Sequence, residues 1–277
     1  MDGFEVLIFI GSFFTVWKFF SQWYAPIFHA WPRERGQIKR TVLSALPMVS
    51  LFIILFTLTS VASFDVVNEP LWVIFYTVLG VAWLWLGVFI MNAVFDLSKN
   101  DDVLNMDNQA ALLAYSGGFL GLTLIYAGAN VGDGPGWWCV VFAGGIGLAA
   151  WVALALLVNV LTGIFERVTV ERDTACGVRL GSYLLASGII LGRASAGDWT
   201  SASMTVVEFA SGWPVLVIAL FAIVGERIFT GVDNGHEKPG AYLPSSVILA
   251  VLLLFLAALS VALTPLATGG AVLWKPE

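Results

Sequence analysis

The sequence has few charged residues. Asp, Glu, Lys and Arg make up 12% of its 277 residues, against about 25% in an ordinary soluble domain. Hydrophobic residues make up 59%, and the mean hydropathy is +0.89. This composition predicts a protein whose solvent is the lipid bilayer. The formal net charge is −6 and no stripe of basic residues is present to neutralise phosphates, so we expect no nucleic-acid partner.

Cysteine and histidine are scarce, with two of each. Cys139 and Cys176 lie in apolar runs without metal-ligand spacing, which excludes a disulfide framework and a zinc site and predicts two buried thiols. The segment DNGHEKPG, with Asp233, His236 and Glu237, resembles a metal-binding loop but has the composition of an ordinary turn. P-loop, HExxH and GxSxG motifs are absent. We therefore expect no metal, no cofactor and no catalytic residues.

Eight apolar runs are long enough to cross a membrane. A bilayer core about 30 Å thick requires about 20 apolar residues per helix. The runs are continuously apolar, which favours helices over the alternating strands of a barrel. The first contains Lys18 and no clear cleavage site, so we expect a retained helix and not a signal peptide. The sequence predicts an all-α membrane protein with one polytopic domain, 1–277, and spans at about 3–24, 42–63, 71–95, 109–130, 136–165, 174–194, 205–229 and 242–264.

Lysine and arginine are distributed unevenly between the two sets of loops. Most of these residues lie in the loops that follow the odd-numbered spans. The loops and chain end on the other side of the membrane have only Arg193 and Lys275. By the positive-inside rule, the basic loops are cytoplasmic and both termini lie outside the cytoplasm. The linkers are short and leave no room for a soluble catalytic domain. The basic residues of the loops that follow spans one, three, five and seven are Arg33, Arg35, Lys39, Arg40, Lys99, Arg167, Arg172, Arg227 and Lys238.

Two similar segments begin the fourth and sixth spans: DNQAALLAYSGG at 107–118 and RDTACGVRLGSY at 172–183. A shift of 65 residues (173 − 108) aligns Asn108 with Asp173. Because each repeat contains two spans, we expect repeated two-helix units in parallel orientation, related by an axis along the membrane normal. Asn108 and Asp173 are good N-cap residues for helices that enter the membrane from the cytoplasm.

Glycines follow both caps at a spacing of four. Small residues at this spacing let two membrane helices approach closely. We therefore predict that the fourth and sixth spans lie against each other in the middle of the bundle. The glycines that form these motifs are Gly117, Gly121, Gly177, Gly181, Gly188 and Gly192.

Asn92, Asn159 and Glu226 recur near the ends of successive odd spans. Intramembrane polar residues are functional candidates by default, so the three could line a polar path. They lie within a turn or two of a loop, which favours the simpler interpretation that they cap the next helix or sit at the membrane interface.

Arg179 is the most unusual charge, because it lies inside the start of the sixth span. We expect it to snorkel to the cytoplasmic interface, and we favour this over a buried pair with Asp107, Asp173 or Glu226.

The segment 81–199, with NMDNQAALLAYSGGFLGLTL and VERDTACGVRLGSYLLASGIILGRA, resembles the YjfL-like inner-membrane family, also called domain of unknown function 350. The family's Asn-x-Ala-Ala motif is matched by NQAA at 108–111, and the second copy departs from it as DTAC at 173–176. The resemblance implies a bacterial inner-membrane protein associated with envelope or membrane-stress gene clusters, and it supplies no catalytic residues. The helices in 1–80 and 200–277 would be additions to a four-helix core.

Three functions remain open. The leading hypothesis is a non-enzymatic component that self-associates or scaffolds a membrane-stress complex, with the bilayer, a second copy and stress proteins as candidate partners. The alternative is a channel or small-solute transporter, whose path would be lined by Asn92, Asn159, Glu226 and Arg179. The third is an enzyme acting on lipid or quinone, for which we would expect a lateral apolar pocket that ends in converging polar groups.

Overall fold

The computed structural model describes residues 3–29, 37–231 and 242–264, and these residues form helices without any strand. Seven helices are long and apolar enough to span a membrane, or eight if a bent pair counts as one span. The predicted fold class is therefore confirmed. The turn at 233–240, considered above as a metal-binding loop, lies outside the described residues, as do Arg33, Arg35, Lys238 and Lys275.

The spans agree with the predicted runs to within a few residues at most of their ends. They are α1 (Gly3–His29), α2 (Gln37–Ser60), α4 (Pro70–Val94), α5 (Gln109–Ala129), α6 (Trp137–Thr162), α8 (Thr174–Ala194), α10 (Pro214–Gly231) and α11 (Leu243–Leu263). Short elements connect them: α3 (Phe64–Asn68), the π-helical turn η1 (Lys99–Asn105), α7 (Ile164–Thr169), α9 (Ala202–Phe209) and the 3-10 turn η2 (Ala210–Gly212).

The seventh predicted span is not one straight helix. Its first part is α9 and η2, and its second part is α10, with a bend of 42° between them. The break lies next to Pro214, whose ring removes a backbone donor and clashes with the preceding turn of a helix. The expectation of a continuous run over 205–229 is corrected to this broken span.

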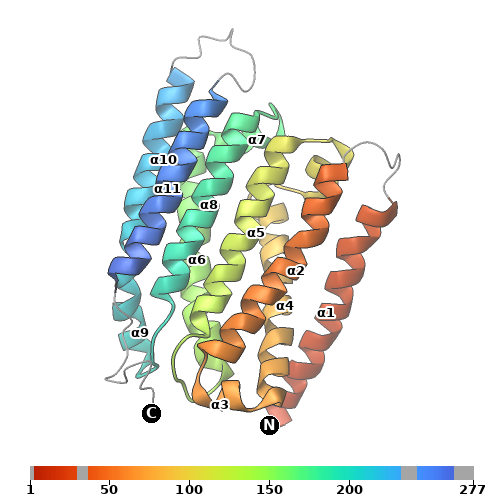
Figure 1. Ribbon diagram of the computed structural model, residues 1–277, viewed down its shortest axis with the longest axis vertical. Helices are drawn as coiled ribbons and strands as arrows, with labels where there is room; N and C mark the ends of the chain where they lie inside the picture. Colours follow the sequence, from red (N-terminus) through yellow and green to blue (C-terminus); the bar gives the residue numbers. More distant parts are fainter. Residues whose placement is uncertain (1–2, 30–36, 232–241, 265–277) are drawn as a thin grey trace.

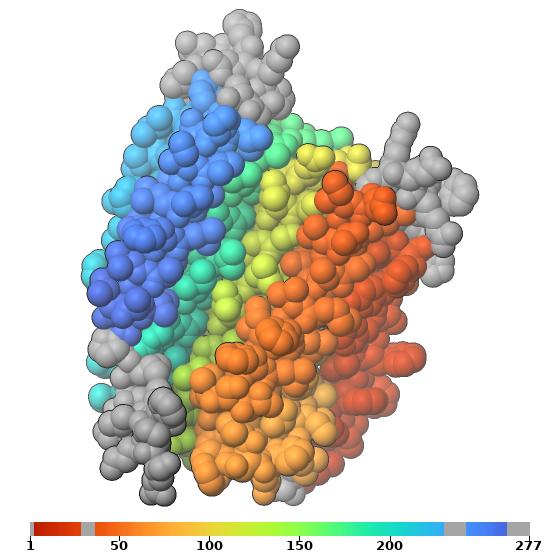
Figure 2. All heavy atoms as spheres, in the orientation of Figure 1, coloured from red at the N-terminus to blue at the C-terminus, as the bar shows by residue number. Residues whose placement is uncertain are grey.

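The helices form two layers. In one layer α2, α5, α8 and α11 lie side by side, and α4 and α6 lie behind them (Figure 1). Helix α10 contacts α6, α8 and α11, and α1 contacts α4. The chain runs up and down, so η1 and α7 lie at one end of the bundle, here called the α7 end, and α3 and α9 lie at the other (Figure 1). Figure 2 shows α5 and α8 as a diagonal strip between α2 and α11.

Helices α5 and α8 are in very close contact along a line of glycines, here called the glycine seam. A Cβ added at Gly177 would lie 2.5 Å from the Cα of Ala110, and one added at Gly121 would lie 2.5 Å from the carbonyl oxygen of Leu184. Real Cβ atoms do not approach backbone so closely, so only glycine permits this spacing. The other glycines of the predicted motifs lie on the same seam: Gly117, Gly181, Gly188 and Gly192.

Candidate functional site

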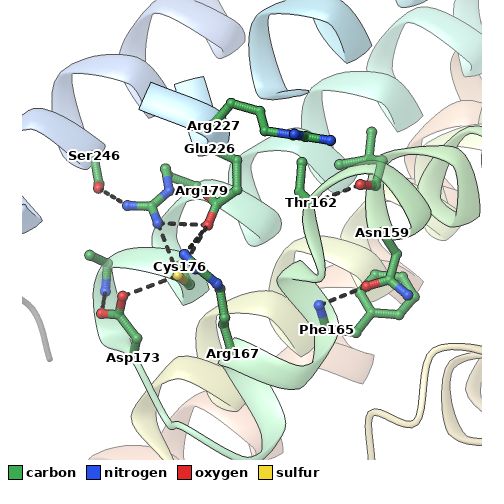
Figure 3. A network of polar contacts seen from close by, with 12 residues as sticks. Asn159, Thr162, Phe165, Arg167, Asp173, Cys176, Arg179, Glu226, Arg227 and Ser246 are labelled. Carbon is green, nitrogen blue, oxygen red and sulfur yellow. Dashed lines mark hydrogen bonds and ion pairs between the residues drawn. The ribbon is translucent and has the colours of Figure 1, made fainter. Parts of the chain in front are cut away.

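Asn92, Asn159 and Glu226 do not converge on one path. Asn92 is exposed near the end of α4. The Oδ1 of Asn159 accepts a hydrogen bond from the backbone N–H of Phe165, 3.0 Å away, and so caps α7. Glu226 is fully buried in α10. Figure 3 shows Asn159 turned toward α7 and Glu226 turned toward α8.

Arg179 and Glu226 form a buried ion pair. Arg179 is 4% exposed and Glu226 is 0% exposed. The Nε of Arg179 lies 2.5 Å from Glu226 Oε2, and its Nη2 lies 3.0 Å from Oε1. This two-point geometry is the strong form of an arginine–carboxylate contact. The prediction that Arg179 snorkels to the interface is wrong, because α10 and α11 cover this face of α8 and α10 supplies a carboxylate within reach (Figure 3).

The remaining N–H groups of Arg179 donate to side chains of α11 and α8. Nη1 donates to Ser246 Oγ of α11 at 2.5 Å, and Nη2 also donates to Cys176 Sγ at 2.9 Å. The guanidinium lies 4.8 Å from the ring centroid of Phe229, a cation–π contact. One arginine of α8 therefore bonds side chains of both α10 and α11.

The network continues to the α7 end of the bundle. The Sγ of Cys176 lies 3.1 Å from Asp173 Oδ2 and 3.4 Å from Glu226 Oε1, so its single hydrogen can be donated to either carboxylate. Arg167 Nη1 lies 3.3 Å from Glu226 Oε1, and its side chain is 25% exposed. Asp173 caps α8, since its Oδ1 accepts from the N–H of Ala175 at 2.8 Å. We call Arg167, Asp173, Cys176, Arg179, Glu226 and Ser246 the buried charge network.

Asn108 has a second contact besides its cap. Its Oδ1 accepts from the N–H of Ala111 at 3.1 Å, and its Nδ2 donates to the carbonyl of Val168 at 2.7 Å. Because Val168 belongs to α7, the amide joins the start of α5 to that helix. The residues before the two caps, Asp107 and Arg172, have positive φ angles of 54° and 58°.

Replacing Asn108 with alanine is expected to lower the free energy of unfolding by about 2 kcal/mol. The change removes a helix cap, worth about 1 kcal/mol, and leaves the buried Val168 carbonyl without its donor. Ser201→Ala is the matched control, because Ser201 caps α9 and its other side-chain contact is with Ser203 of the same helix, so it joins no second helix. Unfolding in mixed micelles measures both, and equal losses would contradict the bridging role of the amide.

Lys99 is a buried cation that sequence reasoning missed. It is 5% exposed, and its Nζ donates to the carbonyls of Trp23 at 2.7 Å and Gln22 at 3.4 Å. Pro26 lacks an N–H and leaves the Gln22 carbonyl without its usual helical donor. The sequence does contain one signal for this contact: Pro26 follows Gln22 by four residues, which indicates a free helix carbonyl that a donor could reach.

Burial lowers the pKa of Lys99 to about 8. Between this value and its ordinary value of 10.5, the unfolded chain binds a proton that the folded chain does not. The free energy of unfolding is therefore expected to rise as the pH goes from 8 to 10.5. Lys99→Met should remove this rise. The melting temperature of both proteins, measured against pH in a neutral detergent, gives the comparison. An unchanged curve would mean that Lys99 reaches water.

The chemistry available in the described residues is that of hydrogen bonding and charge pairing. No group of three or more His, Cys, Asp or Glu side chains that could hold a metal ion occurs among them. The buried charge network can hold α7, α8, α10 and α11 together or stabilise a charge within the membrane.

Comparisons with known proteins give one match. Residues 41–173, slightly less than half of the chain, match the family model described as Domain of Unknown Function (DUF350). No curated protein and no solved structure matches the chain. The matched segment contains most of α2 and all of α4, α5 and α6, and it begins and ends earlier than the resemblance over 81–199. Over these residues the chain is similar to that family, and its long apolar helices are those of a multi-pass membrane protein.

Proposed function

We propose that this chain is a non-enzymatic membrane component that scaffolds an envelope or membrane-stress complex. The glycine seam is the observation that carries the proposal, because α5 and α8 close the centre of the bundle with backbone contacts. A centre filled in this way suits a rigid framework better than a solute path. The glycines of the seam contact partners within the chain, so association with a second copy or another protein would use the outer faces of other helices.

The bacterial inner-membrane location, the YjfL-like relationship and the cytoplasmic position of the α7 end belong to the same proposal. The basic residues Lys39, Arg40, Arg167, Arg172 and Arg227 support this orientation, since they all lie at or near the α7 end. Labelling of Arg172→Cys in intact cells tests it, because both natural cysteines are buried. The new cysteine is expected to be protected from a membrane-impermeant maleimide. Labelling before lysis would show that the α7 end faces outward, opposite to the proposal.

Parallel two-helix repeats are also part of the proposal. Their support is local: the backbone N–H of Asn108 bonds the carbonyl of Asp102, and the N–H of Asp173 bonds that of Arg167. Both bonds span six residues, and each stands directly before a helix of the glycine seam, α5 in the first case and α8 in the second.

The test combines stoichiometry with transport. The chain in lipid nanodiscs is imaged to count copies and bound partners, and the same protein in proteoliposomes is assayed for flux of protons, potassium and small solutes. The scaffold proposal expects a defined assembly and no flux above empty vesicles. Flux that depends on the chain would overturn it.

A channel or transporter is the second candidate, and the buried Arg179–Glu226 pair favours it, because ionisable groups within a membrane span often belong to ion or proton pathways. The double variant Arg179→Met with Glu226→Met separates the two functions. It keeps the helices together without charge, so it should leave a scaffold's assembly intact and abolish flux through a pathway that needs these groups.

A further inference from the structure

A pocket of about 690 Å³ lies between α1 and α4 near the α7 end. Its walls include the aromatic side chains of Phe19, Trp23 and Trp85. It opens at the surface of the molecule, because the rim contains exposed polar residues: Ser21, Gln22, Asn92 and Asn100. The pocket thus combines an apolar wall with a polar rim at the height where a span meets the membrane interface.

One amine lines this pocket, and a second lies next to one of its walls. Lys99 lines it, and its Nζ is 4.6 Å from the ring centroid of Trp23. Lys18 is exposed on α1, and its Nζ lies 5.6 Å from the ring centroid of Trp85, another wall residue. Lys18 lies about 16 Å before the end of α1, at 1.5 Å per residue, so its long side chain has to extend toward the interface to keep its charge out of the bilayer core.

Neither amine has a carboxylate partner in the part of the chain that the structure describes. The nearby acidic side chains of η1 are engaged elsewhere: Asp102 Oδ2 accepts from the N–H of Ser98, and Asp101 Oδ1 accepts from Asn105. Lys99 bonds only backbone carbonyls. The lowered pKa of Lys99 agrees with a cation that lacks a counter-charge. The pocket is therefore electrostatically incomplete and fits an anion.

We propose that this pocket binds the headgroup phosphate of an anionic phospholipid from the leaflet at the α7 end. Lys18 and Lys99 supply the positive charge, and the amides of Asn92 and Asn100 supply hydrogen-bond donors. A lipid fits better than a free anion because large apolar side chains are exposed along α1 and α4 below the rim, including Trp17 and Phe89. Basic pockets between membrane helices are suited to such headgroups.

Native mass spectrometry of the purified full chain tests the proposal with phosphatidylglycerol and phosphatidylcholine of identical acyl chains. Lys18→Gln and Asn92→Asp are the variants, and both change exposed side chains. Each is expected to weaken phosphatidylglycerol binding about tenfold, by loss of a charge-assisted contact or by repulsion. Phosphatidylcholine binding should change much less, because its choline group already neutralises the charge of its phosphate. Arg172→Gln is the matched control, since Arg172 is exposed at the same end but bonds Met106 and lies outside the pocket.

Three results would overturn the proposal. Equal binding of the two lipids would mean that the pocket does not distinguish an anionic headgroup from a zwitterionic one. Displacement of phosphatidylglycerol by millimolar inorganic phosphate would identify a site for a free anion. An equal loss in Arg172→Gln would assign the effect to the overall surface charge of the α7 end.

Discussion

Replacing Glu226 with alanine is expected to lower the free energy of unfolding by about 3–5 kcal/mol, the cost of leaving a buried charge without its partner. Arg179 would keep its bonds to Ser246 and Cys176 but would lose both contacts with the carboxylate. It cannot reach water, because it is covered by α10 and α11. SDS titration in mixed micelles, followed by circular dichroism, measures the loss.

Two controls separate charge from packing. Arg167→Gln removes a longer and partly exposed contact with Glu226, so its cost should be about 1 kcal/mol or less. The double variant Arg179→Met with Glu226→Met removes both charges and should recover most of the stability, since apolar replacement of a buried pair is often neutral. If Glu226→Ala cost no more than Arg167→Gln, the pair would be solvated and the network would not hold α10 to α8.

Local signals in the sequence were sufficient for seven of the eight predicted spans and for the caps of α5 and α8, but they missed the break in the seventh span. The apolar runs fixed the spans because a helix in lipid must satisfy its own backbone groups. Asn108 and Asp173 could be assigned as caps because a cap depends on the next three residues only. The spacing of Gly117, Gly121 and Gly181 predicted the central pair because small residues matter only where backbones meet.

Contacts between distant spans could not be predicted in the same way. Arg179 and Glu226 are 47 residues apart in different helices, and nothing in the sequence states which faces of α8 and α10 meet. The sequence alone therefore favours a snorkelling Arg179 over one that pairs with Glu226. Lys99 presents the same difficulty, since its partners are backbone carbonyls of α1, 76 and 77 residues away, that no side-chain pattern reveals.

Replacing Gly188 with alanine is expected to be a strongly damaging single-methyl change, with a loss of about 3 kcal/mol or more in the free energy of unfolding. The new Cβ would collide with the Cα, carbonyl carbon and carbonyl oxygen of Gly121. Backbone atoms cannot rotate away as the end of a side chain can, so α5 and α8 would have to separate along the seam. Folded yield by size-exclusion chromatography and SDS titration measure the effect.

Gly145→Ala is the matched control, because no atom lies within 4 Å of a Cβ added at this position of α6. It should not destabilise the protein and can stabilise it by up to about 1 kcal/mol, because alanine is a better helix former than glycine. Equal effects at the two glycines would mean that the seam yields readily, and the centre of the bundle could then open. The scaffold proposal requires the opposite result, since a framework with a solute-tight centre depends on α5 and α8 remaining in backbone contact.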